Sequence, residues 1–470
     1  MTNPSISNCV SAHSNIEEER EEREAIAARF IDTIRQQLPA LIESLAKIKD
    51  YRNPKKVGHQ LTMVLFYGVL CFVLQASSRR EANREMSGPA LLVHLQNVFP
   101  EIHKIPHQDT LNRVLSNIDV EALQEAHVAM IRRLIRNKKL KRWLVAGCYP
   151  ISLDGTQKAV RRELISEQWL QRRINAGTDD ETTQFYVYVL EANLTFANGL
   201  TLPLMSEFLS YAEGDTDNNK QDCEMRAFHR LARRIKAAFP RLPIMILLDG
   251  LYPNGPVLKA CRDNHWQYMI VLKDNSLPSV WEEYNGLRDC EPGQQAELTW
   301  GNRRQHFQWV NDIEYRYGLN NKNKQTVHVV VCNEFWEDVD QDGETVQKAS
   351  RHAWLSSRPL TKSNLHERCN LGARHRWGIE AAILVEKRHG YQYEHLFSHD
   401  WNAMKGYHYL MHLGHALNLL AQYSEQLAAI VASRGIRAFN KCVRDTLLSP
   451  WLDAKRLYDR LSPTPQLRLV

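Results

Sequence analysis

Three charged residues in the segment 374–391 (RHRWGIEAAILVEKRHGY) are spaced so that a helix would carry them on one face. At about 100° per residue, Arg376, Glu380 and Lys387 fall within roughly 40° of one another around the axis, whereas Glu386 points away. An acid between two cations suits a divalent metal ion beside a phosphate. The alternative is an exposed surface helix, on which an Arg–Glu pair at this spacing stabilises by only a few tenths of a kcal/mol.

Two aspartates stand where predicted strands end. Asp154 lies in SLDGT and Asp249 in LLDGLYPNG, and each is followed by glycine. Ligands of open sheets gather beyond the carboxyl ends of parallel strands, so both aspartates can face one pocket. If the helix of Glu380 packs across that edge, three carboxylates offer hard oxygen ligands for Mg²⁺ or Mn²⁺. Taken singly, each Asp-Gly pair is also typical of a turn.

The chemistry that uses such a carboxylate set is in-line displacement at a phosphodiester. Two metal ions about 4 Å apart activate the attacking oxygen and stabilise the leaving oxygen. Arg376 and Lys387 would then contact phosphates and place the scissile bond. The three carboxylates and two cations together predict a two-metal phosphodiester site.

The elements that must position these residues form an α/β pattern. Residues 143–156 and 184–209 are rich in strand formers, and the second stretch is divided by Asn198-Gly199, a strong hairpin signal. An amphipathic helix, a buried strand at 242–250, a second helix and a strand at 266–275 follow. The predicted element order is therefore β-β-β-α-β-α-β, followed by the helix of Glu380.

Composition places the chain among ordinary globular proteins of two to four domains. It has 470 residues, of which 43% are hydrophobic and 24% charged. The nine cysteines are scattered without a C-x-x-C pair, so neither a disulfide framework nor a zinc site is indicated. The N-terminus lacks a secretion signal, and the apolar stretch 61–76 is shorter than the roughly 20 residues that span a bilayer. We expect a cytoplasmic protein with no membrane segment, and a buried helix at 61–76.

Basic residues cluster in three segments although the net charge is only +6. The clusters at 132–143, 161–173 and 434–444 suit phosphate backbones. Solvated Lys- and Arg-rich helix faces are the alternative. We interpret the clusters as candidate DNA contacts.

Changes in residue pattern divide the chain into six segments. Helical periodicity dominates before residue 144, strand patterns with polar turns fill 276–359, and helical periodicity then returns. We expect residues 1–20 to form a disordered tail, 21–143 a helical domain that binds DNA, 144–275 the first part of the α/β core, 276–359 a β-strand insertion, 360–425 the second part of the core with the helix of Glu380, and 426–470 a helical tail that provides dimer contacts.

The sequence resembles a known family. The pattern R-x3-E-x6-K at Arg376, Glu380 and Lys387, preceded by SLDGT and LLDGLYPN, is similar to the DDE transposases of bacterial insertion sequences that carry the Y-R-E-K signature. The segments 220–231 and 390–410 are similar to segments of such transposases, and the likeness extends over about residues 40–425. One position departs from the signature, because Ala373 stands where the tyrosine is expected.

The resemblance implies a ribonuclease-H-like catalytic core with a β-strand insertion before the helix of the glutamate. Asp154, Asp249 and Glu380 would be the metal ligands, with two Mg²⁺ or Mn²⁺ ions, and Arg376 and Lys387 would hold DNA phosphates. In several such enzymes an aromatic residue of the insertion stacks on a flipped base. Trp300 and Trp309 are the candidates, and the alternative is that both pack the core of the insertion.

The expected function is cleavage at the ends of an insertion sequence and strand transfer into target DNA. The partners would be the terminal inverted repeats, the target DNA and a second copy of the chain. Two alternatives stay open: a ribonuclease-H-like nuclease that never joins strands, and an inactive transposase-derived DNA-binding protein. Because of Ala373, a hairpin intermediate is not assumed.

Overall fold

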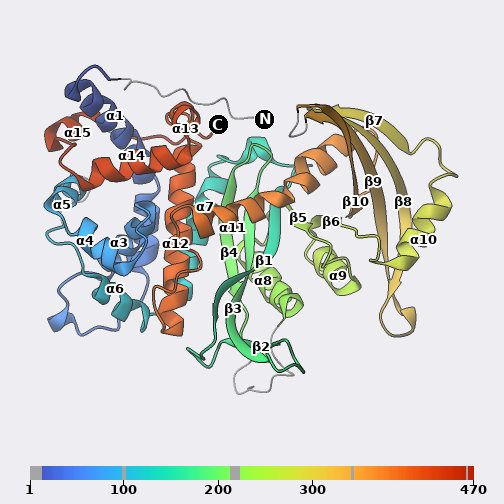
Figure 1. Cartoon of the computed structure of the whole chain (residues 1–470), viewed down its shortest axis with the longest axis horizontal. Helices are drawn as coiled ribbons and strands as arrows, with labels where there is room; N and C mark the ends of the chain where they lie inside the picture. Colours follow the sequence, from blue (N-terminus) through green and yellow to red (C-terminus); the bar gives the residue numbers. More distant parts are fainter. Residues whose placement is uncertain (1–12, 98–101, 212–222, 340–342, 462–463) are drawn as a thin grey trace. The chain divides into compact units, whose positions relative to one another are not determined.

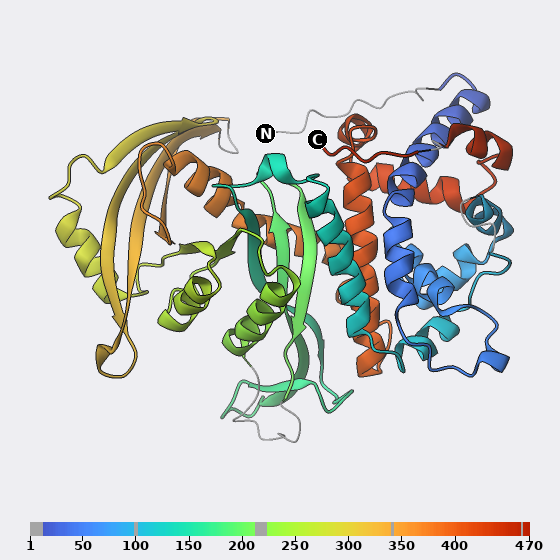
Figure 2. The same ribbon diagram turned by 180° about the vertical axis from the view of Figure 1, so that it is seen from behind.

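The computed structural model describes residues 13–97, 102–211, 223–339, 343–461 and 464–470 (Figures 1 and 2). The chain forms two compact units. We call Met1–Arg133 with Glu386–Val470 the helical unit, and Leu134–Val385 the sheet unit. A helical N-terminal region is thus followed by a large mixed sheet with helices, as the sequence predicts.

The helical unit is built around two apolar helices, α3 and α12. The expected buried helix at 61–76 is confirmed as α3, whose residues from Val64 to Val73 are all buried. Gly414 of α12 lets the two backbones approach, because a Cβ there would lie 2.7 Å from the Cβ of Phe72. No helix in the described part of the chain is both long and apolar enough to cross a membrane. The helices of this unit are α1 (Ile16–Arg35), α2 (Leu38–Ala46), α3 (Leu61–Val73), α4 (Arg79–Met86), α5 (Pro89–Gln96), α6 (Gln108–Leu115), most of α7 (Glu121–Arg136), α12 (Trp401–Gln422), α13 (Ala428–Arg434), α14 (Ile436–Leu448) and α15 (Ala454–Arg460).

The C-terminal helices α13 to α15 pack within the helical unit. The rings of Phe30 in α1 and Phe439 in α14 lie 6.4 Å apart, and the His94 ring of α5 is 2.8 Å from the Leu447 carbonyl oxygen. The apolar face of α14 is therefore covered by the chain's own α1 and α5. The segment 426–470 is therefore part of the helical unit and not a separate tail, while its dimer contacts stay a prediction.

Two other predicted boundaries differ from the structure. The predicted tail 1–20 is already helical from Ile16, where α1 begins with an Asn15 cap, while residues 1–12 lie outside the described residues. Helix α12, assigned from the sequence to the second part of the core, belongs to the helical unit. The apolar pattern of α12 indicates that the helix is buried, but it does not indicate which other elements cover it.

The sheet unit contains one continuous mixed sheet. Its order is β2-β3-β1-β5-β6-β10-β9-β8-β7, with β4 also paired to β3. Strands β5 and β6 run parallel to β1, whereas all other pairs are antiparallel. The strands are β1 (Tyr149–Arg161), β2 (Leu170–Ile174), β3 (Thr182–Thr195), β4 (Thr201–Phe208), β5 (Ile244–Leu248), β6 (Gln267–Val271), β7 (Gln295–Trp300), β8 (Arg303–Tyr317), β9 (Asn323–Val339) and β10 (Thr345–Ser356).

The predicted hairpin at Asn198-Gly199 joins β3 to β4. Gly199 adopts φ +90°, a left-handed conformation that glycine tolerates best, and Phe196 N–H donates to the Leu200 carbonyl at 2.9 Å. The crossover helices α8 (Glu224–Ala238) and α9 (Gly255–Asp263) also occur in the predicted order. The short strand β2 is an addition that the sequence analysis did not predict.

The strands of the predicted insertion extend the core sheet instead of forming a separate module. Strand β10 pairs with β6 from Trp354 opposite Val271 onward. A shared hydrophobic cluster joins Met245 of β5 to Phe307 of β8 and Trp354 of β10. The segment also contains helix α10 (Pro278–Leu287), although no helix was expected there.

Helix α11 (Gly378–Arg388), which carries Glu380, begins against the β3–β4 hairpin. Figures 1 and 2 show α11 on one face of the strand layer and α8 and α9 on the other. A Cβ at Gly378 would lie 2.4 Å from Cγ2 of Thr195 and 2.9 Å from Oγ1 of Thr201. Glycine at this position therefore sets how closely the helix of Glu380 approaches the sheet.

We expect Gly378→Ala to destabilise the protein by about 1–3 kcal/mol, because the new methyl group overpacks the contact with Thr195. Gly286→Ala in α10 is the matched control, since a Cβ there meets nothing within 4 Å and alanine is the better helix former. Urea unfolding of the two variants is the measurement. Equal stabilisation of both variants would contradict the close docking of α11.

Candidate active site

Asp154 and Asp249 lie level with each other on the neighbouring parallel strands β1 and β5. The last registered pair of these strands is Ser152 with Leu247. Each aspartate follows its member of that pair by the same distance in sequence (154 − 152 = 249 − 247 = 2). The structure thus brings both aspartates to one edge, beyond the part of β1 that pairs with β5.

The local setting of Asp154 differs from the expectation. The sequence analysis placed Asp154 at the end of its strand, in a tight turn, but β1 continues to Arg161 with Asp154 opposite Glu191 of β3. The strand continues because β3 is long enough to pair with β1 after β5 has ended. For Asp249 the expectation is confirmed, since β5 ends at Leu248.

Gly155 is required by close packing and not by a turn. A Cβ there would lie 2.5 Å from both Oε2 of Glu224 and the hydroxyl oxygen of Tyr188. Glu224 opens α8 and accepts hydrogen bonds from Tyr188 at 3.1 Å and from Tyr252 at 2.5 Å. Tyr252 also closes the turn after β5, where its N–H donates to the Asp249 carbonyl at 3.3 Å.

Glu224 is therefore a fourth acid beside the site, and sequence reasoning missed it. The only local signal was an acidic residue at the start of an amphipathic helix, which is common because a negative charge there is favourable. Through Tyr252 this carboxylate supports the turn that carries Asp249.

Glu380 lies in the first turn of α11 and is paired with Arg376. Arg376 Nη2 donates to Glu380 Oε1 at 2.8 Å. The arginine stands in the short 3₁₀ turn Ala373–Trp377 that precedes α11, and it is only 4% exposed. Its Nε and Nη1 have no hydrogen-bond partner among the described residues. Both nitrogens are closed off from solvent, so in this structure Arg376 holds Glu380 and does not present these two donors to a phosphate.

Negative charge converges on Asp154. Burial raises the pKa of Asp154 to about 7, the charge of Glu380 adds to this rise, Arg376 opposes it, and Glu224 and Asp249 raise it further. Asp154 therefore lies within electrostatic range of the other three carboxylates. The opposing charge of Arg376 is too weak to restore an ordinary pKa.

A hard divalent cation fits this donor set. Carboxylate oxygens are the ligands that Mg²⁺ and Mn²⁺ prefer, and a cation would relieve the repulsion that raises the pKa of Asp154. Within the described residues, the oxygens of the predicted acids do not all lie within 4.8 Å of one another, and Glu380 is held by Arg376. The acids are thus neighbours in an open arrangement that a metal ion would draw together.

Lys387, the second predicted phosphate contact, has a partner of its own in the helical unit. Its Nζ lies 2.9 Å from Glu394 Oε1 and 5.8 Å from the centre of the Tyr393 ring. The Glu394 side chain is 58% exposed, so this pair is a surface pair that a phosphate could replace at little cost.

The two tryptophans proposed for base stacking differ in their settings. Trp309 is 3% exposed and belongs to the hydrophobic core of the sheet unit, so its stacking role is corrected to a packing role. Trp300 is half-buried at the end of β7, with the guanidinium of Arg374 4.8 Å from the centre of its ring. The residue that sequence reasoning missed is Trp377, which is 62% exposed three positions before Glu380.

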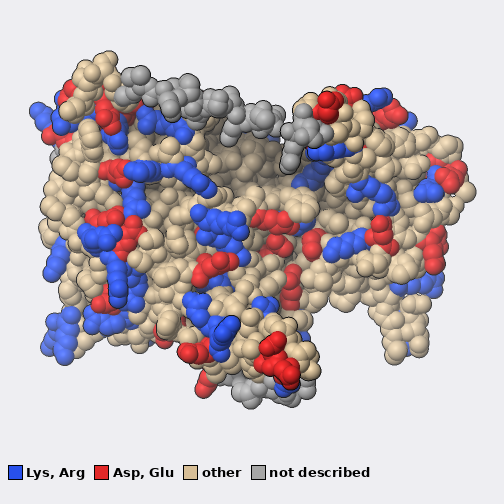
Figure 3. All heavy atoms as spheres, viewed as in Figure 1, with Lys and Arg blue, Asp and Glu red and all other residues tan. Residues whose placement is uncertain are grey.

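The three basic clusters are not equally available. In the cluster at 434–444, Arg434 pairs with Glu22 at 2.5 Å, and Arg444 pairs with Glu81 and Glu85. Arg136, Lys138 and Arg142 of the first cluster and Arg162 and Arg173 of the second are exposed. Figure 3 shows basic and acidic side chains interleaved over the helical unit on one face. The first two clusters therefore remain the candidates for DNA contact.

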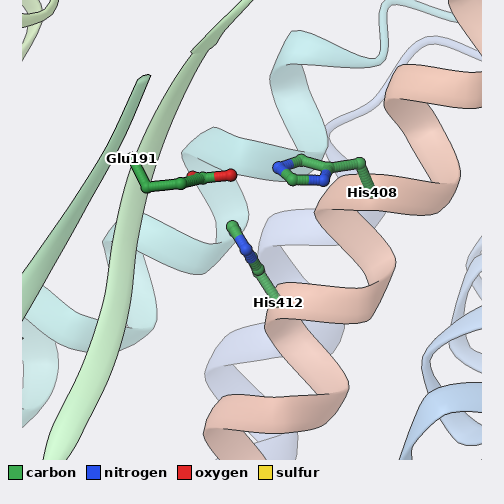
Figure 4. A group of neighbouring side chains, drawn as sticks. All are labelled: Glu191, His408 and His412. Carbon is green, nitrogen blue, oxygen red and sulfur yellow. The ribbon is translucent and has the colours of Figure 1, made fainter. Parts of the chain in front are cut away.

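A second set of buried titratable groups lies in the helical unit. His412 and His415 of α12 face Glu386, with His415 Nδ1 2.7 Å from Oε1 and His412 Nε2 3.5 Å from Oε2. Figure 4 shows His408 and His412 projecting from α12, and it also draws Glu191 of β3. Within its own unit the Glu191 carboxylate accepts a hydrogen bond from Ser206 at 2.6 Å. Glu386, His412 and His415 form a buried ionic cluster of the helical unit.

The fold is that of an α/β protein in which Asp154 and Asp249 lie level with each other, beyond the paired part of two parallel strands. Residues 42–131, in the helical unit, match the family model described as DDE_Tnp_1-associated. This N-terminal region is associated with DDE_Tnp_1 transposases, which links the chain to a transposase-related function. The matched region contains none of the acids of the candidate site. A comparison with curated proteins gave no match.

Proposed function

We propose that this chain is a metal-dependent DNA transposase that cleaves DNA at the ends of an insertion sequence and transfers the freed strands into target DNA. The observation that carries the proposal is that Asp154 and Asp249 lie level on neighbouring parallel strands, and that Glu380 lies close enough for its charge to add to the burial that raises the pKa of Asp154. The match of the N-terminal region to a transposase-associated family supports it independently.

The arrangement of the sheet supports a ribonuclease-H-like core. Strands β1, β3 and β4 are antiparallel neighbours, and β5 and β6 then add in parallel after the crossover helices α8 and α9. This is the element order that the family resemblance implies. Strands β7 to β10 occupy the place of the insertion, between β6 and the helix of Glu380.

Asp154, Asp249 and Glu380 would hold the metal ions. Bound there, two divalent ions would lower the pKa of an attacking water or hydroxyl and stabilise the leaving oxygen. Arg376, which donates to Glu380 in this structure, would offer a donor to a phosphate oxygen and orient the scissile bond. Glu224, through Tyr252, would keep the Asp249 turn in place.

Cleavage and joining would use the same acids in succession. Water first attacks the phosphodiester and leaves a 3′-hydroxyl on the cut end. That hydroxyl then attacks a target phosphodiester, so one bond forms as another breaks. Because two ends must be processed together, two copies of the chain would act on one pair of terminal repeats.

The test that separates this function from simple nuclease activity is a strand-transfer assay. The full chain is incubated with Mg²⁺, a duplex that carries an end of the encoding element, and a supercoiled target plasmid. We expect cut ends that become joined to the target. Cleaved product without any joining would favour a ribonuclease-H-like nuclease, and neither reaction would overturn the proposal.

Metal affinity should depend on pH because Asp154 must lose its proton to bind a cation. With its pKa raised to about 7, Asp154 is mostly protonated below that pH. We expect Mn²⁺ affinity to fall about tenfold per pH unit below pH 7 and to level off above it. The loss of the free Mn²⁺ signal in electron paramagnetic resonance measures this, and the dependence should vanish in Asp154→Asn. An affinity independent of pH in the wild type would contradict the assignment.

Trp377 is proposed to stack on a base at the cleavage site. Its ring is 62% exposed, and Arg376 covers part of it at 4.7 Å from the ring centre. Stacking on a base contributes about 1–3 kcal/mol, so Trp377→Ala should slow cleavage roughly 5- to 150-fold. Phe335→Ala is the control, because Phe335 is a similarly exposed ring of the same unit. Equal effects of both changes on the cleavage rate would remove Trp377 from the site.

A further inference from the structure

A polar cleft of about 520 Å³ lies in the sheet unit, away from the carboxylates. It is formed where α9 ends and β6 begins, beside β9 and the end of β10. Because β6 runs parallel to β5 and Gln267 is its first residue, this cleft is at the edge opposite to Asp249. Its lining includes Arg262, His265, Trp266, Gln267, Lys324 and Arg358.

The charges around the cleft are predominantly positive. Arg368 is 2% exposed behind Gln267, to whose Oε1 its Nη1 donates at 2.6 Å. Its other recorded partner is the Ser356 hydroxyl at 3.0 Å, and no carboxylate pairs with it in the described part of the chain. Burial lowers the pKa of Arg368, and the like charge of Arg358 lowers it further. Arg368 thus lies buried without a counterion.

The single acid of the lining is already neutralised. Glu314 pairs with Arg316 at 2.7 Å and with Lys324 at 3.1 Å. Arg358 is exposed at the cleft, and Arg262 has only a long contact of 3.8 Å to exposed Asp263. Arg262 and Arg358 thus line the cleft without a strong carboxylate partner among the described residues, and Arg368 lies buried behind Gln267.

We propose that this cleft binds a phosphate group of DNA at a point distinct from the carboxylate site. Guanidinium groups supply donors only, which suits the acceptor oxygens of a phosphate. The cleft is open to solvent, so a phosphate within a long backbone can enter it. That the phosphate belongs to DNA and is not a free phosphate ion rests on the proposed function. That the cleft binds an anion does not depend on the proposed function.

The test compares Arg262→Gln/Arg358→Gln with the charge-matched control Arg241→Gln/Arg304→Gln, whose arginines are also exposed on the sheet unit. Titrations use the full chain with EDTA, so that divalent ions at the carboxylates do not contribute. One arm measures inorganic pyrophosphate binding by calorimetry. The other measures binding of a random duplex by fluorescence anisotropy at several salt concentrations.

We expect the cleft variant to lose at least tenfold in duplex affinity relative to the control, with a salt slope lower by about 2, as expected when two phosphate contacts are removed. If pyrophosphate affinity falls while duplex binding and its slope match the control, the site takes free phosphate and the DNA assignment is overturned. If both ligands bind the cleft and control variants equally, there is no anion site.

Discussion

Replacing Glu386 by glutamine is expected to lower the free energy of unfolding by about 3–5 kcal/mol, the usual effect of breaking a buried ion pair on one side. Glu386 is 1% exposed and faces His412 and His415. Glutamine keeps the size of the side chain but leaves both imidazoles without their carboxylate. Glu394→Gln is the control, because its pair with Lys387 is a surface pair and should contribute less than about 1 kcal/mol.

The same cluster predicts how stability responds to acid. Burial alone would raise the pKa of Glu386, but His412 and His415 outweigh it and lower the pKa well below 4.5. A carboxylate whose pKa is lowered by folding stabilises the folded state fully at any pH above its pKa in the unfolded chain. This stabilisation is lost as the pH falls from that value toward the lower pKa of the folded state. We expect the wild type to lose stability on acidification below about pH 4.5 more steeply than Glu386→Gln. Urea unfolding at several pH values tests this, and parallel curves would contradict it.

Replacing Asp249 by asparagine is expected to reduce the rate of DNA cleavage by about 10³-fold or more. A metal ion that acts as a Lewis acid contributes several kcal/mol to the transition state, and each 1.36 kcal/mol is tenfold in rate. Asp249 directly follows β5 and is level with Asp154, so its replacement removes one of the two proposed aspartate ligands. The overall fold should be retained, because among the described residues the Asp249 carboxylate has only a local hydrogen bond, from the Leu251 N–H.

Asp289→Asn is the matched control, because Asp289 is 77% exposed in the same unit and far in sequence from any proposed ligand. Single-turnover cleavage of an end-bearing duplex with saturating Mg²⁺ measures both variants. A rate for Asp249→Asn within tenfold of the control would remove Asp249 from the metal site.

The order of the elements could be read from the sequence because each leaves a local signal. The continuous apolar run before Asp249 is typical of a parallel strand covered on both faces, and β5 is fully buried as expected. The pair Asn198-Gly199 predicted the β3–β4 hairpin because the turn requires a left-handed backbone, which Gly199 adopts.

The features that could not be predicted depend on neighbours distant in sequence. Gly155 after Asp154 indicated a turn, yet it lies within β1 and makes room for Glu224 and Tyr188. Glu224 and Tyr188 are separated from Gly155 by tens of positions in the sequence. No local sequence pattern could therefore reveal that glycine is needed at position 155 to make room for them.

The same limit applies to side chains whose burial decides their role. Residue type alone does not distinguish Trp309 from Trp377. In the structure Trp309 packs in the core, whereas Trp377 is exposed and lies three positions before Glu380. Likewise, Arg444 belongs to a basic cluster whose charge is neutralised by Glu81 and Glu85 of α4, an element more than 300 residues earlier in the chain (444 − 85 = 359). Charge clusters in a sequence therefore identify candidates for DNA contact, and only the fold shows which are already paired.

The most direct test of the three-carboxylate site compares the wild type with Glu380→Gln for Mg²⁺-dependent cleavage and joining of DNA that carries the ends of the encoding element. The substitution keeps the size of the side chain and removes its charge. We predict that the wild type cuts and joins, while the variant still binds the ends and does neither. If the variant cuts and joins at the wild-type rate, Glu380 is only the partner of Arg376 on a charged surface, and the proposed mechanism is wrong.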